Sequence, residues 1–154
     1  MSISTRAALW SLFVIAAMAP CGSRASDAQS PIGLWKTFDD STGIARALVS
    51  IYEKDGRLFG RIEKVVEAKS DNELCSACKD ERKNQPIIGL VIIRNVEKQG
   101  DAYGGGDILD PESGSVYRCK MHLEQGGTRL IVRGYISFSF IGRSQSWQRQ
   151  ATTN

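Results

Sequence analysis

The stretch SVYRCKMHLE, residues 115–124, alternates strictly between two kinds of side chain. The less polar set is Tyr117, Cys119, Met121 and Leu123, and the polar set is Arg118, Lys120, His122 and Glu124. Consecutive side chains of a β-strand point to opposite faces, so this period of two places the first set in a core and the second in water. The stretch therefore predicts a half-buried strand.

Further runs of this kind lie on both sides of it. They cover residues 33–38, 46–54, 57–66, 86–98, 102–109, 128–138 and 142–150. Turn signals separate most of them. Asp55-Gly56 is a two-residue hairpin signal, because a type I′ turn needs positive φ at both central positions. DPESG at 110–114 has Asp, Pro and Gly where a tight turn prefers them. The run 86–98 is nearly all apolar, so we expect a strand buried over much of its length.

The short connections between the runs indicate how the predicted strands pair. Consecutive strands joined by tight turns favour antiparallel pairing. Eight such strands can bury their apolar face and remove both edges by closing into an up-and-down barrel. Its interior would hold side chains or one small ligand. The sequence thus predicts an all-β fold, with a barrel favoured and a two-sheet sandwich as the alternative.

The first predicted strand opens with Gly33-Leu34-Trp35, preceded by Pro31. This resembles the G-x-W opening of the lipocalin superfamily, in which the Trp closes the narrow end of the barrel beneath a basic residue from the last strand. The resemblance implies that Trp35 and Arg149 form this barrel-closing pair, as a cation–π contact. The chain departs from ordinary lipocalins because it has no T-D-Y-type loop and no helix after the last strand. The usual ligands of lipocalins are therefore not inferred for this chain.

Four longer segments resemble a second family. They are GLWKTFDDSTG, CSACKDERKNQPIIGL, GGDILDPESGSVYRCK and VRGYISFSFIGRSQSW. Together they are similar to the domain-of-unknown-function 2147 family of exported bacterial proteins, over about residues 33–149. The resemblance implies a small lipocalin-like barrel in the cell envelope, and it implies no reaction.

The N-terminal residues have the pattern of a secretory signal peptide. Arg6 precedes the mostly apolar run AALWSLFVIAAMA, residues 7–19, and the small residues of GSRAS follow. The run is too short to span a bilayer as a helix. We expect cleavage after Ala25, with Ala28 as the alternative site, and a mature protein that is periplasmic or secreted.

Two other interpretations of this region are a buried core helix and a lipid anchor on Cys21. Pro20 before that cysteine disfavours the anchor, because lipoprotein processing prefers a small residue there. Cleavage after Ala25 divides the chain into a signal peptide at 1–25, a linker at 26–32, a single barrel domain at 33–150 and a tail at 151–154.

The mature chain would carry almost no net charge. The full sequence has 20 Lys and Arg against 17 Asp and Glu, and the predicted signal peptide contains Arg6, Arg24 and no acidic residue, which leaves +1 after cleavage. A near-neutral chain without a basic stripe lacks the electrostatic field that nucleic-acid binding needs. We expect one domain with one core, and no transmembrane segment in the mature chain.

Three cysteines remain after cleavage, Cys75, Cys78 and Cys119. Paired thiols of an exported protein are normally oxidised, and an odd count leaves one over. We expect a Cys75–Cys78 disulfide that stiffens its loop, with Cys119 free. A bridge from Cys119 to either of the others is the alternative. Thiol exchange at the CxxC pair is disfavoured, since no helix N-terminus in a βαβ unit is predicted there.

A metal site is also disfavoured. Cys75, Cys78, Cys119 and His122 have ligand-like spacings, but Cys119 and His122 lie three apart in a strand and point to opposite faces. Asp107, Asp110 and Glu112 suggest acid–base chemistry, yet turn chemistry accounts for DPESG. There is no G-x-S-x-G, P-loop or G-x-G-x-x-G motif. We expect no cofactor and no enzymatic activity.

The polar segment 67–86 is unusually long for a connection inside a compact domain, which is typical of functional loops. Its charged cluster supplies candidate partner-binding residues, and a solvated loop is the alternative. The candidates are Lys79, Asp80, Arg82, Lys83 and Asn84. No protein partner is identified by the sequence.

These patterns predict a non-enzymatic binding protein for a small hydrophobic or amphiphilic ligand, such as a fatty acid. The candidate lining residues are Tyr117, Met121, Leu123, Ile62, Leu130, Val132 and Ile136. One alternative is an interaction module of the envelope whose barrel is filled by these side chains. The other is thiol–disulfide activity at the CxxC pair.

Overall fold

The computed structural model describes residues 29–66, 72–137 and 141–151, so the predicted signal peptide lies outside it. Within these residues, eight strands and the short 3-10 helix η2 follow one another. They are β1 (Gly33–Phe38), β2 (Ala45–Lys54), β3 (Arg57–Val65), β4 (Val91–Gln99), β5 (Ala102–Asp110), β6 (Ser115–Glu124), η2 (Gln125–Gly127), β7 (Arg129–Tyr135) and β8 (Gly142–Gln150).

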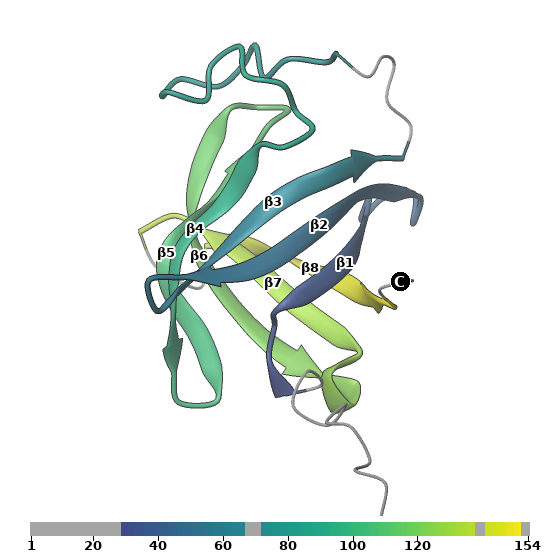
Figure 1. Ribbon diagram of the computed structural model, residues 1–154, viewed down its shortest axis with the longest axis vertical. Helices are drawn as coiled ribbons and strands as arrows, with labels where there is room; N and C mark the ends of the chain where they lie inside the picture. The colour runs from purple at the N-terminus through teal and green to yellow at the C-terminus, as the bar shows by residue number, and fades with distance from the viewer. Residues whose placement is uncertain (1–28, 67–71, 138–140, 152–154) are drawn as a thin grey trace, which may run out of the picture.

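The strands form a closed barrel in which each pairs antiparallel with its neighbours in sequence (Figure 1). The last strand returns to the first, with Trp35 of β1 opposite Arg149 of β8. Because this pairing removes both sheet edges, the barrel prediction is confirmed and the sandwich alternative is wrong. Among the described residues no helix has the length and hydropathy needed to cross a membrane.

Local turn chemistry sets the strand register as expected. Asp55 and Gly56 have φ values of 52° and 75°, which is the pair of positive angles that a two-residue hairpin between β2 and β3 requires. The glycine run of β5 produces a register shift between Tyr103 and Gly106, with Gly105 at φ 82°. This irregularity is a β-bulge.

The strand predicted from residue 86 begins only at Val91. Gly89 turns the chain with φ 90°, and its N–H donates to the Ile62 carbonyl at 2.7 Å, while Pro86 forms an isolated bridge with Leu74. Residues 86–90 therefore belong to the connection that precedes β4. We call the described part of this connection, residues 72–90, the β3–β4 segment.

The core is one continuous cluster. It contains the inward side chains of the barrel together with Cys75, Cys78 and Leu90 of the β3–β4 segment. Ile92 and Ile93 are both buried although they are neighbours on β4. Consecutive strand residues face opposite sides, so both faces of β4 are covered at this point. The β3–β4 segment thus adds a layer at one end of the barrel, at the top of Figure 1.

Candidate functional site

One end of the barrel is closed around Trp35. This side chain is fully buried, and its indole N–H donates to the Pro31 carbonyl at 2.8 Å. The Arg149 guanidinium carbon lies 4.3 Å from the Trp35 ring centroid, a cation–π geometry. The same guanidinium donates to the carbonyls of Gly127, Ile32 and Ser30 at 2.7, 2.8 and 2.6 Å. A single residue of the last strand therefore ties together the N-terminal segment and the β6–β7 connection.

The glycine before Trp35 has a steric role in this closure. Gly33 has φ 138°, and a Cβ there would lie only 2.7 Å from a terminal nitrogen of Arg149. Any larger residue would push the guanidinium away from the Trp35 ring. The G-x-W spacing is thus explained by contacts within this chain.

A cavity of about 980 Å³ lies toward the opposite end of the barrel. This volume is at the upper end of the range of small-molecule binding pockets. Its inner wall is mostly aliphatic and aromatic, and all eight strands contribute residues to it. The wall residues include Val49, Ile62, Ile92, Ile108, Leu109, Tyr117, Val132, Gln145 and Trp147.

The predicted lining residues divide between this cavity and the closed end. Ile62, Tyr117, Val132 and Ile136 line the cavity. Met121, Leu123 and Leu130 do not: Met121 and Leu130 are buried in the core, with Met121 opposite Tyr103 and Leu130 opposite Trp147, and Leu123 packs against this core. All seven residues occupy alternate positions of the predicted strands and are expected to face inward. Alternation identifies that face but says nothing about height along the barrel, so part of the prediction was wrong.

The β3–β4 segment lies across the wide end. Glu73, Leu74, Ser76, Ala77 and Ile87 contribute to the cavity lining. A disulfide joins Cys75 and Cys78, and both side chains are only 1% exposed. The Cys75 N–H donates to the Gln85 carbonyl at 2.9 Å, which folds the two arms of the segment together. Its contact with the β5–β6 turn is close, since a Cβ at Gly114 would overlap the Ala77 carbonyl oxygen.

The charged cluster of this segment is only partly available to a partner. Arg82 is 4% exposed, and its guanidinium binds both carboxylate oxygens of Asp80 and the Val91 carbonyl. Hydrogen bonds from Arg82 lower the pKa of Asp80 to about 2. The expectation that Arg82 is a solvent-facing partner residue is therefore wrong. Lys79, Lys83 and Asn84 are exposed.

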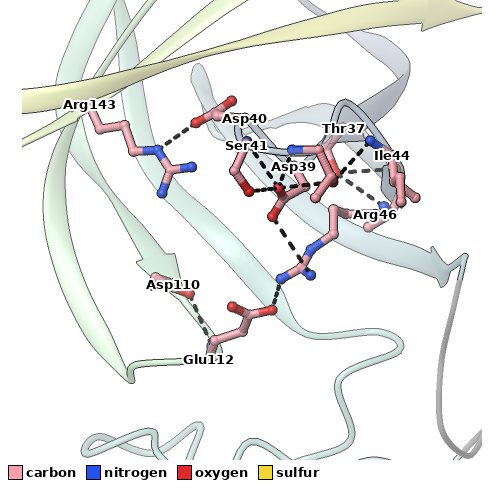
Figure 2. A network of polar contacts seen from close by, with 11 residues as sticks. Thr37, Asp39, Asp40, Ser41, Ile44, Arg46, Asp110, Glu112 and Arg143 are labelled. Carbon is pink, nitrogen blue, oxygen red and sulfur yellow. Dashed lines mark hydrogen bonds and ion pairs between the residues drawn. The ribbon is translucent and has the colours of Figure 1, made fainter.

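A polar network surrounds the cavity entrance (Figure 2). The Asp39 carboxylate accepts hydrogen bonds from the backbone N–H and hydroxyl groups of Ser41 and Thr42, which hold its pKa well below the usual range. Arg46 of β2 contacts both Asp39 and Glu112 of the β5–β6 turn. It therefore links two turns that are far apart in sequence.

Arg143 of β8 extends the same network. Its Nε donates to the Asp40 carboxylate of the β1–β2 turn, and it lines the cavity. Sequence reasoning missed Arg46 and Arg143, as well as Gln145 on the inner wall. DDSTG and DPESG are fully explained as local turns, so no local signal indicated that arginines from two strands would join them.

Cys119 and His122, two of the residues with metal-ligand spacing, do not lie together. Cys119 is buried and free, and burial, together with the nearby Asp107 charge, raises its pKa to about 12. His122 lies on the outer face within 3.2 Å of Glu124. In the part of the chain that the structure covers, no three His, Cys, Asp or Glu side chains gather in a geometry for a metal ion.

The carboxylates of the β5–β6 hairpin have separate environments. Asp110 accepts from the Glu112 N–H and the Ser113 hydroxyl, as a turn residue does. Asp107 is in β5 instead, so turn chemistry does not account for it. Its half-buried carboxylate has a pKa raised by burial.

Comparisons with known proteins agree with this architecture. A solved structure described as protein HP1028 from Helicobacter pylori, which belongs to the lipocalin family, superposes with a TM-score of 0.69 at 16% identity. The match covers 80% of this chain and 84% of that one, and at this identity it shows the fold alone. A comparison with curated protein sequences finds no match. The model of a family of uncharacterized proteins conserved in bacteria, DUF2147, matches residues 33–149, and the chain therefore belongs to this family.

Proposed function

We propose that the protein is an exported, non-enzymatic binding protein that holds a small hydrophobic or amphiphilic molecule in the barrel cavity. The observation that carries this proposal is the cavity of about 980 Å³, walled by Ile62, Ile108, Val132, Trp147 and their neighbours. An apolar pocket of this size with a few polar groups is the usual form of a small-molecule site. An amphiphile fits because the wall is apolar and the entrance is charged.

The proposed export rests on the N-terminal sequence and on the cysteines. Residues 1–25 have the three-part pattern of a signal peptide, with cleavage after Ala25. The Cys75–Cys78 disulfide suits an oxidising compartment. A periplasmic or secreted location agrees with both features.

The two other functions have less support. An interaction module with a side-chain-filled barrel does not need an internal cavity. Thiol exchange needs an accessible, low-pKa thiolate, whereas the Cys75 and Cys78 side chains are buried. The exposed Ile136 and Ile141 near the cavity entrance favour some contact at this end, beside the carrier role.

Native mass spectrometry of the mature protein, purified gently from the periplasm, tests the proposal. We expect a stoichiometric adduct of lipid mass that is lost on denaturation, and its mass would identify the ligand class. A bare protein mass that persists after incubation with a total lipid extract would contradict the carrier function.

A further inference from the structure

The inward face of β8 differs from the rest of the cavity wall. Its alternate residues Arg143, Gln145 and Trp147 all line the cavity. The residues between them point outward, where Ser144 and Ser146 accept hydrogen bonds from Arg133 and Arg129 of β7. The other strands contribute mainly aliphatic side chains to the same space. Apart from Arg46 at the entrance, the side chains with N–H groups that line this cavity therefore lie on β8.

The orientation of the Gln145 amide follows from its neighbour. The Trp147 indole nitrogen lies 3.2 Å from Gln145 Oε1. An indole N–H can only donate, so the atom it contacts must be the amide oxygen. The Gln145 NH2 group is then left as a donor, and none of the described residues accepts from it. A half-buried donor without a protein acceptor is a specific position for a ligand acceptor.

Arg143 supplies a second donor on the same face. It lies two residues nearer the entrance than Gln145, about 7 Å along the strand. Its Nε is bound to Asp40, so its terminal nitrogens remain on the other edge of the fork (Figure 2). With 67% of its side chain exposed, Arg143 can adjust toward a ligand that has entered the cavity.

The acceptors around the entrance are already occupied. Asp40 is paired with Arg143 and Glu112 with Arg46, while Asp39 is surrounded by the Ser41 and Thr42 donors. Asp110 accepts from its own turn. Glu73 is exposed, where water screens its charge. Three of the four carboxylates that line the cavity thus already have donors within the protein, whereas the Gln145 NH2 group has no acceptor among the described residues.

We infer that the ligand is a carboxylate-bearing amphiphile whose carboxylate binds the Gln145 NH2 group and the Arg143 guanidinium. Its apolar chain extends past Trp147 toward Val49 and Ile62. This assignment rests on the proposed carrier function, and it adds the chemical class and the orientation of the ligand. Gln145 and Arg143 are the specificity-determining residues, because they separate a carboxylate from an alcohol or an ammonium group on the same chain.

Calorimetric titration of the mature protein with three probes of equal chain length tests the inference. The probes are palmitate, hexadecanol and hexadecyltrimethylammonium. We expect palmitate to bind at least about tenfold more tightly than hexadecanol, as one hydrogen bond to a charged group provides. The ammonium probe should bind most weakly.

Gln145→Glu is the decisive variant. Its carboxylate still accepts from the Trp147 indole, but the donor becomes an acceptor of like charge to palmitate. We expect at least a tenfold loss of palmitate affinity and little change for hexadecanol. Gln148→Glu is the matched control, since Gln148 is on the exposed outer face of the same strand, and it should leave all three affinities unchanged. Arg143→Gln, at a position with 67% of its side chain exposed, should also weaken palmitate binding selectively.

The outcomes separate the two proposals. Equal binding of palmitate and hexadecanol, with Gln145→Glu behaving like Gln148→Glu, would overturn the carboxylate assignment and leave the carrier function standing. Preference for the ammonium probe would overturn the assignment in the same way. If none of the probes binds and the native mass spectrum shows no adduct, the carrier function fails and the assignment fails with it.

Discussion

Arg149 illustrates how one side chain can stabilise a whole end of the barrel. It stacks on Trp35 and donates to three backbone carbonyls that belong to two separate segments. A planar guanidinium can make all these contacts at once, whereas a lysine ammonium cannot match its fork. Arginine and lysine carry the same charge, so the stabilising effect of Arg149 comes from the geometry of its guanidinium.

We therefore expect Arg149→Lys to lower the free energy of unfolding by about 2 kcal/mol, as the loss of charge-assisted hydrogen bonds implies. Urea denaturation of both proteins measures this difference. Arg57→Lys is the control, because Arg57 is in an exposed pair with Glu97, and such pairs contribute little. An Arg149→Lys protein as stable as the wild type would show that the carbonyl contacts do not stabilise the closed end.

At the scale of elements, the β3–β4 segment decides the form of the wide end. The disulfide and the Cys75–Gln85 hydrogen bond give it internal structure. The buried Arg82 anchors it to β4 through the Val91 carbonyl. Its tip packs on the β5–β6 turn at Gly114. A long connection without regular secondary structure is thus held as a fixed layer.

Two glycines allow this packing to be measured. Gly114 and Gly126 have nearly the same φ, 66° and 64°, but only Gly114 faces another element, since nothing lies within 4 Å of a Cβ at Gly126. Alanine at either position incurs the backbone strain of about 1 kcal/mol. We expect Gly114→Ala to cost a further 1–3 kcal/mol, roughly the cost of overpacking.

Thermal unfolding of the two variants gives the comparison. If Gly114→Ala and Gly126→Ala lose the same stability, the β3–β4 segment does not press on the β5–β6 turn in solution. If Gly114→Ala alone also alters ligand affinity, the contact shapes the cavity entrance as well.

For the whole molecule, several carboxylates with lowered pKa values make the stability of the fold depend on pH in the acidic range. Hydrogen bonds from Arg82 lower the pKa of Asp80 from 3.8 to about 2. A group whose pKa is depressed in the folded state adds stability above its unfolded pKa, and this stability is lost as the pH falls through the folded pKa. The contribution of Asp80 is therefore complete at neutral pH and declines between about pH 4 and pH 2.

We expect Asp80→Asn to be less stable than the wild type at pH 7, since it leaves the buried Arg82 without its ion pair. The two proteins should converge near pH 2, where the wild-type carboxyl becomes protonated. Denaturation at a series of pH values measures both curves. Parallel curves over this range would contradict the assigned pairing of Asp80 with Arg82.

Much of the fold could be predicted from local pattern. Alternation in 115–124 identified β6 with its inward residues, and Asp55-Gly56 identified the hairpin between β2 and β3. These signals are local because side-chain direction has a period of two and positive φ is a property of single residues. The boundary of β4 was predicted wrongly, because Pro86–Leu90 is as apolar as a strand, yet Gly89 turns the chain there.

The sequence by itself determined eight strands, their order and their inward faces, and its resemblance to lipocalins indicated the end of the barrel that Trp35 closes. Only the tertiary structure decided where the interior is filled and where it is hollow, because alternation contains no information about height along the axis. It also decided that Arg82 is buried, that Arg46 and Arg143 meet the turns at the entrance, and that Gln145 lines the cavity with its amide oxygen bound to Trp147. Those relations join residues distant in the chain, and closure of the barrel is what brings them together.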